Sequence, residues 1–226
     1  MGSNSADHLN VRYDAASVVW ADKMRLLGYY DAYLGFLSNW PGLAAGAHRI
    51  ADVGAGSGAM AEAWVAVNGA PAGMILIDPS RGMLSTAERA LARRGVMAES
   101  LAAPLSAGMV APQDVVLAGH VIEHFSDPVA ALRDMGSLLR PGGRLWLSVS
   151  KPHWCNAIIW LQWRHRTYRD DAVWRMLAAA GFAPELTYAF PSGPPSRTSR
   201  GYVATWRGSQ GTASTASFTT AQCGDP

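Results

Sequence analysis

The stretch Asp52-Val53-Gly54-Ala55-Gly56-Ser57-Gly58 determines how the rest of this chain is interpreted. It follows an apolar segment at 48–53 that is typical of a strand, and it leads into a helical pattern at about 58–68. Glycines between a strand and a helix permit a tight turn and let a ligand approach the backbone closely. The part from Gly54 to Ala59 also fits the permissive dinucleotide pattern GxGxxG/A, so the loop by itself does not identify the nucleotide.

Two carboxylates near the loop narrow the choice of ligand. Asp52 lies two residues before the first glycine, where a carboxylate suits a cationic ligand and would contribute nothing to a pyrophosphate. Asp78 ends the next apolar stretch and can accept hydrogen bonds from both ribose hydroxyls. The pair favours a nucleoside that carries a sulfonium and an α-amino group. An ordinary acid that caps the following helix is the alternative for Asp78.

Alternating strand and helix patterns on both sides of the loop set the fold class. Strands are expected at 48–53, 73–77, 96–99, 113–118 and 144–149, with helices at about 58–68, 80–93 and 128–139. This alternation predicts an α/β fold with a Rossmann-like, doubly wound sheet of about seven strands. Two further strands are expected near 184–190 and 201–206, the last of them antiparallel. Ser126 or Asp127 would cap the helix that starts near Pro128.

The chain divides into three predicted parts. Residues 1–45 would form an N-terminal helical lid, with helical periodicity over 8–38. Residues 46–207 would form the nucleotide-binding domain, with an insertion at about 151–180 and a rigid Pro-rich loop at 191–197. The remainder, 208–226, is rich in Gly, Ser, Thr and Ala and is expected to be a disordered tail.

Composition limits the partners. The 226 residues carry a net charge of +2, which is too small an excess to favour nucleic acid. No apolar run approaches the roughly 20 residues that a membrane-spanning helix requires, and Cys155 and Cys223 lie too far apart to suggest a metal motif. We therefore expect a cytoplasmic protein that acts on a small molecule, without a nucleic-acid partner or stable membrane insertion. A homodimer is one assembly that it could form.

Taken together, these elements resemble the class I S-adenosylmethionine-dependent methyltransferases, in the small-molecule branch related to ubiquinone and menaquinone methyltransferases. The loop is similar to that family's DxGxGxG motif, and Glu99-Ser100-Leu101-Ala102-Ala103-Pro104-Leu105 resembles its D-A-x-x-L-P-F segment. Asp114 through Pro128 resembles the fourth motif, and Leu139 through Gly143 resembles the turn before the fifth strand. The resemblance covers about 45–150 well and 150–207 loosely.

The resemblance implies S-adenosyl-L-methionine as cofactor and S-adenosyl-L-homocysteine as product. Asp78 would hold the ribose, Met83 would cover the adenine, and Glu99 would accept from the adenine amino group in place of the family's Asp. Tyr13 precedes a helix that folds over the cofactor in this family, and a core aromatic is the alternative for it. The full implied set of cofactor contacts is Tyr13, Asp52, Gly54, Ala55, Gly56, Gly58, Asp78, Pro79, Met83, Glu99, Ser100 and Gly119.

The segment His120-Val121-Ile122-Glu123-His124 supplies the candidate catalytic groups. It formally matches the HxxEH zinc-peptidase pattern, but it follows a strand rather than lying within a helix, so we expect no metal there. A divalent ion serving catechol or quinol methylation is the alternative that related quinone methyltransferases suggest. His124, and then His120, are candidate general bases because imidazole titrates near neutral pH. A structural histidine is the competing interpretation.

An unusual concentration of aromatic and basic residues between 151 and 174 marks the expected acceptor side. Its members are Lys151, His153, Trp154, Trp160, Trp163, Arg164, His165, Arg166, Tyr168, Arg169 and Trp174. Aromatic rings could stack a flat acceptor or hold an amine, and basic groups could hold a carboxylate or phosphate. A helix that packs on the sheet with its basic residues in water is the alternative.

The predicted function is methyl transfer to a small organic acceptor by in-line displacement at the sulfonium, with O- or N-methylation of an aromatic or amine substrate favoured. The first alternative is a nicotinamide-dependent oxidoreductase, although no Tyr-x-x-x-Lys proton relay is found. The second is a non-catalytic module that binds S-adenosylmethionine. The segment Ala118-Gly119-His120-Val121 lacks the D/N-P-P-Y/F/W signature and so speaks against methylation of nucleic-acid bases.

Overall fold

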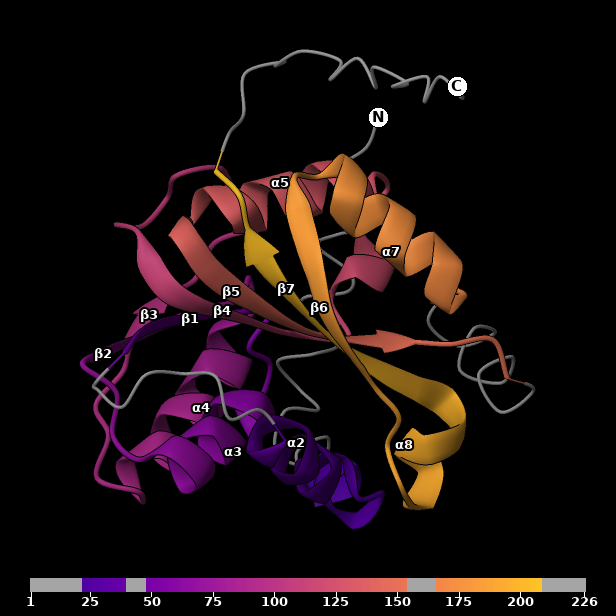
Figure 1. Cartoon of the computed structure of the whole chain (residues 1–226). Helices are drawn as coiled ribbons and strands as arrows, with labels where there is room; N and C mark the ends of the chain where they lie inside the picture. The colour runs from indigo at the N-terminus through magenta and orange to yellow at the C-terminus, as the bar shows by residue number, and fades with distance from the viewer. Residues whose placement is uncertain (1–21, 40–47, 154–165, 209–226) are drawn as a thin grey trace, which may run out of the picture.

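The described residues are organised around a sheet of seven strands, which Figure 1 shows. The computed structural model describes residues 22–39, 48–153 and 166–208. The strand order is β3-β2-β1-β4-β5-β7-β6. The strands are β1 (Arg49–Val53), β2 (Gly73–Ile77), β3 (Glu99–Leu101), β4 (Gln113–Gly119), β5 (Leu139–Ser150), β6 (Phe182–Tyr188) and β7 (Ser199–Trp206). The first five pair in parallel, and β7 runs antiparallel to both β5 and β6, which confirms the predicted fold class.

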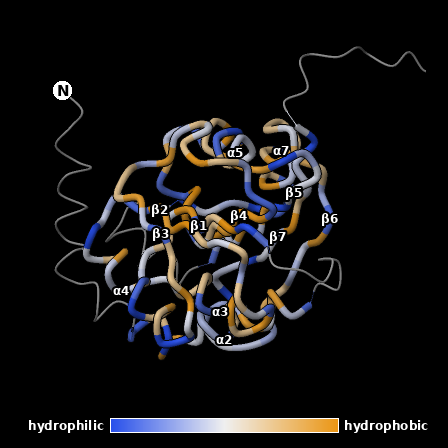
Figure 2. Tube along the Cα trace, turned by 90° about the vertical axis from the view of Figure 1, so that its left-hand side faces the viewer, coloured by the Kyte–Doolittle hydropathy of each residue, from blue (hydrophilic) through white to orange (hydrophobic). Residues whose placement is uncertain are grey.

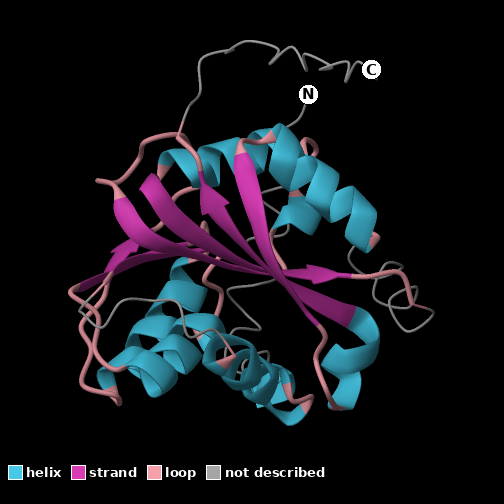
Figure 3. Ribbon diagram, viewed as in Figure 1, coloured by secondary structure: helices cyan, strands magenta, loops and turns pink. Residues whose placement is uncertain are grey.

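Helices cover both faces of this sheet (Figure 3). One face carries α2 (Tyr29–Ser38), α3 (Ala59–Asn68) and α4 (Arg81–Ala92), and the other carries α5 (Pro128–Ser137) and α7 (Asp170–Ala179). Figure 2 shows apolar residues gathered along the strands between these two layers. Because both faces are covered, β4 is a continuous buried run, with Val115 through Ala118 fully buried rather than alternating with polar residues.

The sheet has its topological switch point between β1 and β4. Successive strands are added from β1 outward in one direction as β2 and β3, and in the other direction as β4 and β5. The connections leaving β1 and β4 therefore diverge and open a crevice at the carboxyl ends of these two strands. The glycine loop leaves β1 at this crevice, and Gly119 and His120 leave β4 beside it.

A local signal sets the start of α5. Asp127 caps α5, since its side chain accepts hydrogen bonds from the backbone N–H groups of Val129 and Ala130, both at 3.0 Å. Of the two predicted caps, Asp127 is therefore the one used, and Ser126 is not. The helix ends at Ser137 rather than 139, because Leu139 already pairs with Gln113 as the first residue of β5.

Three other expectations are corrected. In the described part of the predicted 8–38 helix, residues 22–26 are helical but a turn at 27–28 separates them from α2, since Gly28 has a left-handed φ of 80°. The predicted rigid loop at 191–197 contains a short helix, α8 (Gly193–Thr198), whose early prolines need no intrahelical donor. The predicted 96–99 strand lies instead at 99–101, where the chain pairs with β2.

Within the described segments, no helix has the length and apolar character that a membrane crossing requires. The proposed division into lid, domain and tail stays a prediction, since residues 1–21 and 209–226 lie outside the described ranges.

Candidate functional site

The three loop glycines have different tasks. Gly54, Gly56 and Gly58 all have positive φ, at 63°, 52° and 81°. A Cβ on Gly54 would lie 2.4 Å from Val121 Cγ2, and one on Gly58 would lie 2.7 Å from the Cβ of Ala87, so both are required for packing. The nearest atom to a Cβ on Gly56 is 3.9 Å away. Gly56 is therefore where the loop leaves room for a ligand to approach the backbone.

Asp78 is hydrogen-bonded directly to this loop. Its Oδ2 accepts a hydrogen bond from the Gly56 N–H at 2.9 Å, and its Oδ1 accepts from the Ser80 N–H at 2.8 Å. The N-cap of α4 is Ser80, whose hydroxyl accepts from the Met83 N–H at 3.1 Å. Asp78 is thus not the helix cap, and it presents a carboxylate at the carboxyl end of β2, beside Gly56.

Asp52 is a buried acid with an unsatisfied oxygen. Only 1% of the residue is exposed, and its Oδ2 has no hydrogen-bond partner. Burial raises the pKa of this carboxyl to about 8; a hydrogen bond from the Ala61 backbone opposes the shift, and the charge of Asp78 adds to it. The amino group of S-adenosylmethionine is a cationic donor of the kind that such an oxygen lacks, so the residues present fit this cofactor.

The remaining predicted cofactor contacts vary in their placement. Met83 is buried in the first turn of α4, whereas Pro79 is exposed just before that helix. Glu99 is exposed and pairs with Ile75, three residues before Asp78, which separates it from the strand end by about 10 Å. Its proposed contact with adenine stays a prediction. The buried hydroxyl of neighbouring Ser100 has no hydrogen-bond partner.

His120 is held in a strained and fully bonded position. It is the one non-glycine residue with positive φ in the described chain, at 57°, a conformation that costs about 1–3 kcal/mol and often marks a functional site. Its Nδ1 lies 3.2 Å from Glu123 Oε1 and 3.1 Å from Ser150 Oγ, and its Nε2 lies 3.1 Å from Ser148 Oγ. Glu123 is itself fixed, since Oε1 accepts from the Ser150 N–H at 2.7 Å.

His124 has a different environment in the short 3-10 helix Ile122–His124. Its side chain reaches the surface, yet desolvation by adjacent protein groups lowers its pKa, with nearby His120 acting in the same direction and Glu123 and Asp78 opposing. The imidazole is therefore neutral near pH 7 and able to accept a proton. Because the reversed backbone at His120 precedes this turn, the two histidines do not share a helical face as a zinc peptidase needs.

Two tyrosines of α2 join this network, and the sequence analysis missed them. The Tyr29 ring lies edge-on to His120 with centroids 5.4 Å apart, and its hydroxyl is 3.1 Å from Thr198 Oγ1. Tyr33 is hydrogen-bonded to Ser148, and its hydroxyl would lie 2.9 Å from a Cβ on Gly119. Burial raises the pKa of Tyr33, so its hydroxyl stays protonated. Their four-residue spacing places both tyrosines on one face of the helix, and this spacing could have been recognised in the sequence.

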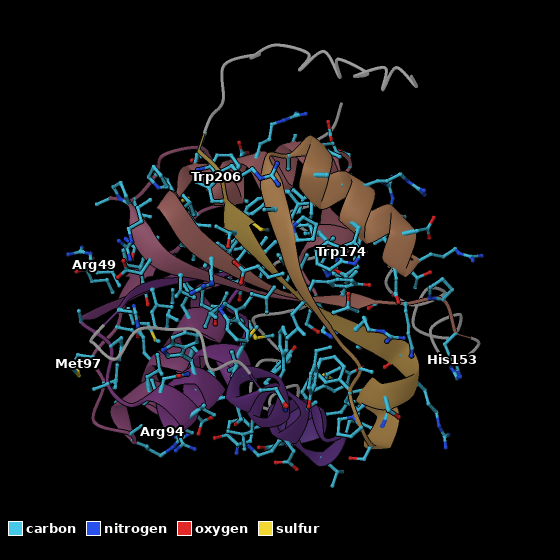
Figure 4. All side chains as sticks on the ribbon, in the orientation of Figure 1. Arg49, Arg94, Met97, His153, Trp174 and Trp206 are labelled. Carbon is cyan, nitrogen blue, oxygen red and sulfur yellow. The ribbon has the colours of Figure 1, made fainter. Side chains whose placement is uncertain are left out.

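The acceptor-side residues are only partly described. Tyr13, Trp154, Trp160, Trp163, Arg164 and His165 lie outside the described residues, as do both cysteines. Trp174 is structural: its Nε1 donates to Thr187 Oγ1 at 3.0 Å, its ring packs edge-on against Tyr202, and Figure 4 shows it beside β6 and α7. Arg166 donates to the Ser126 carbonyl at 3.1 Å. Among the side chains that can be placed, no group of three or more His, Cys, Asp or Glu is arranged to hold a metal.

Comparison with known proteins finds methyltransferases that resemble part of the chain. Residues 51–145 match the sequence profile of the family described as "Methyltransferase domain". The ubiquinone biosynthesis O-methyltransferase of Parvibaculum lavamentivorans is 36% identical over 107 residues, which are 44% of this chain and 39% of that protein. The match thus spans about two fifths of the length of that curated relative.

Solved structures share the fold. A methyltransferase in complex with the Trm112 activator of Haloferax volcanii superposes with a TM-score of 0.69 at 16% identity, covering 85% of this chain and 96% of that one. The 1,6-didemethyltoxoflavin-N1-methyltransferase of Burkholderia thailandensis, with bound S-adenosylhomocysteine, gives 0.66 at 18% identity and covers 89% and 88%. Residues 51–145, which include the glycine loop and Asp78, are similar in sequence to class I S-adenosylmethionine-dependent methyltransferases of the small-molecule branch.

Proposed function

We propose that this protein transfers the methyl group of S-adenosylmethionine to a small organic acceptor, with O- or N-methylation of an aromatic or amine substrate favoured. The observation that carries the proposal is the pair of acids at the switch point. Asp52 offers a buried, unpartnered oxygen for the cationic amino group, and Asp78 is attached to Gly56 where a ribose would lie. Relatives that are O-methyltransferases of ubiquinone biosynthesis support a small-molecule acceptor.

In this proposal the chain binds the cofactor and aligns the acceptor with it. Asp52 binds the amino group, the loop glycines with Ala55 pass close to the methionine and ribose portions, and Asp78 holds the ribose hydroxyls. Met83 packs on the adenine, with Pro79, Glu99, Ser100, Gly119 and Tyr13 as further contacts. The cofactor supplies a methyl group already activated by the positive sulfur. Much of the acceleration would then come from holding the acceptor atom in line with that methyl group.

Two histidines are proposed to manage the acceptor proton. His124 is the first candidate general base because it is exposed beside the crevice and neutral at pH 7. His120 is the second, but both of its ring nitrogens are already hydrogen-bonded to neighbouring side chains.

Three expectations from the sequence stay predictions: cytoplasmic location, the absence of a nucleic-acid partner, and formation of a homodimer. Light scattering tests the last of these.

The test begins with cofactor binding measured by titration calorimetry. S-adenosylmethionine and S-adenosylhomocysteine should bind, NAD(P) should not, and Asp78→Ala should weaken both about tenfold or more by removing two charge-assisted hydrogen bonds. Glu88→Ala, which removes an exposed acid of α4, is the matched control and should change neither. Binding of NAD(P) alone would contradict the proposal.

Acceptor methylation then separates an enzyme from a binding module. A panel of phenols, quinols and amines is incubated with S-adenosylmethionine, and release of S-adenosylhomocysteine is measured. His124→Gln should lower the rate at neutral pH while leaving cofactor affinity unchanged. Cofactor binding without turnover of any member would favour the non-catalytic alternative.

A further inference from the structure

A chain of buried polar side chains crosses the carboxyl ends of β4 and β5, on the face of the sheet that carries α2 (Figure 1). Its members are Glu123, His120, Ser148 and Tyr33. Glu123 is 2% exposed and Ser148 is fully buried, although the strands that lead to them are apolar. Burying polar groups costs free energy unless each is bonded, and a buried network rigidifies the groups that it joins.

The register of the strands shows that these groups share one face. Gly119 of β4 pairs with Ser148 of β5, so the two positions point the same way. Trp146, two residues before Ser148, packs edge-on against Phe36 of α2, which identifies the face as the one that α2 covers. A Cβ on Gly119 would lie 2.9 Å from the Tyr33 hydroxyl. This hydroxyl therefore lies above Gly119 and beside Ser148, to which it is hydrogen-bonded.

The direction of the hydrogen bonds follows from Glu123. Its Oε1 accepts from the Ser150 N–H and lies 3.2 Å from His120 Nδ1. Since Ser150 Oγ, at 3.1 Å, can also accept from this nitrogen, the imidazole proton is held on Nδ1 and the lone pair is left on Nε2. Nε2 then accepts from the Ser148 hydroxyl at 3.1 Å, and Ser148 Oγ accepts from Tyr33. All donors thus point from Tyr33 toward His120.

The Tyr33 end of this chain lies at the crevice. Gly119, beneath the hydroxyl, is partly exposed and is the last residue of β4. Asp52 lies on the same face of β1, because it pairs with Leu117, two residues before Gly119. The charge of Asp52 is close enough to raise the pKa of Tyr33. An acceptor aligned with a cofactor whose amino group is bound at Asp52 would therefore meet the Tyr33 hydroxyl.

We infer that Tyr33 is a catalytic residue that takes the proton of the methyl acceptor, while Ser148 passes the displaced proton to His120. The inference rests on the proposed function. As the acceptor atom bonds to the methyl carbon and the sulfur–carbon bond breaks, the acceptor proton moves to the Tyr33 oxygen. At the same time the Tyr33 proton moves to Ser148, and the Ser148 proton moves to His120 Nε2.

One proton thus passes from the acceptor to the imidazole, and the resulting imidazolium faces Glu123. No tyrosinate forms along this route, which agrees with the burial that raises the pKa of Tyr33 and keeps its hydroxyl protonated. The hydrogen bonds that occupy both nitrogens of His120 become the route by which the proton arrives. The relay therefore places His120 ahead of His124 as the group that finally holds the proton.

The first test follows the proton with 4-nitrophenol, which absorbs visible light as the phenolate and not as the phenol. The full chain is saturated with S-adenosylhomocysteine one pH unit below the pKa of the probe, where about one tenth of the free probe is phenolate. Binding to wild type should raise the ratio of phenolate to phenol about tenfold, to a phenolate fraction of about one half.

Variants that break one link should abolish this gain. Tyr33→Phe and Ser148→Ala each remove a hydroxyl with little change in shape, and both should return the bound probe to about one tenth phenolate. Tyr188→Phe is the matched control, because it removes a hydroxyl that also contacts α2, through Asn39 at 3.4 Å, outside the relay. It should keep the full gain. Circular dichroism confirms folding, and Tyr33→Phe decides the matter if Ser148→Ala does not fold.

Three results would overturn the relay: an unshifted probe in wild type, a full gain in Tyr33→Phe or Ser148→Ala, or a gain that His124→Gln abolishes and His120→Gln retains. Because the assay involves no methyl transfer, the two proposals fail differently. A gain without methylation of any phenol, quinol or amine contradicts the proposed function alone. Methylation without the gain contradicts the relay alone.

Turnover supplies a second test, with the phenol that is methylated fastest. Tyr33→Phe and Ser148→Ala should each lower kcat about 100-fold, and the double variant should lose no more than either single variant, since both break the same relay. Losses that multiply in the double variant would show two independent effects and would overturn the relay.

Discussion

Cofactor binding should release a proton from Asp52, and this can be measured. With a pKa of about 8, the buried carboxyl is roughly 90% protonated at pH 7 when the site is empty. Arrival of a cationic amino group at the unpartnered oxygen favours the carboxylate, so S-adenosylhomocysteine should displace about 0.9 protons per molecule at pH 7 and about 0.1 at pH 9. The same linkage makes affinity rise about tenfold from pH 6 to 7 and about fivefold from pH 7 to 8, and then level off.

Calorimetry in two buffers of different ionisation enthalpy counts these protons. The amino group of the ligand also titrates, and it releases or takes up the same number of protons with wild type and with Asp52→Asn. The difference in proton release between the two proteins therefore gives the contribution of Asp52. Asp52→Asn should lose the proton release assigned to this residue and bind about tenfold or more weakly at pH 8, because an amide cannot pair with the ammonium. Equal proton release from both proteins would refute the reasoning.

The same shift governs stability without ligand. Since the folded-state pKa is raised from 3.8 to about 8, the folded protein binds more protons than the unfolded chain between these values. The contribution of Asp52 to the free energy of unfolding is therefore complete below about pH 4 and is lost as pH rises through 8. Asp52→Asn should melt at a higher temperature than wild type at pH 9, with a smaller difference at pH 5, which also shows that the variant folds.

Three further predictions concern particular contacts. Gly54→Ala should destabilise the protein by about 1–3 kcal/mol in urea unfolding, because its Cβ meets Val121, whereas Gly56→Ala should lose cofactor affinity with a smaller loss of stability. Glu62→Gln should lower the free energy of unfolding by about 1–3 kcal/mol in the same assay. This buried acid accepts a hydrogen bond from Arg94 at 3.1 Å and also pairs with Arg25, and both arginines are partly exposed. An unchanged unfolding midpoint would contradict this prediction. Gly136→Ala should cost about 1–3 kcal/mol, because its Cβ would lie 2.4 Å from the Trp206 ring, and Gly142→Ala, with no close neighbour, is the comparison for packing.

Much of the sheet could be predicted because its signals are local. The strand before Gly54, the loop itself and the capped helix at Pro128 each depend on residues within a few positions of one another. The antiparallel direction of the last strand also followed from the general behaviour of mixed sheets and is confirmed by its pairing with β5. Where prediction failed, at residue 28 and at 193–198, a left-handed glycine and two tolerated prolines altered the local geometry.

By itself, the sequence determined the alternating α/β architecture, the glycine loop and the two acids beside it, because spacing along the chain encodes strand ends and tight turns. Only the tertiary structure decided which groups stand together beyond the loop. Tyr33 reaches Ser148, His120 lies against Ser148 and Ser150, and Lys151 neighbours Arg200, all through contacts between segments remote in sequence. The burial that leaves an oxygen of Asp52 unpartnered and raises its pKa likewise exists only after packing, since desolvation is a property of the folded core and not of the residue type.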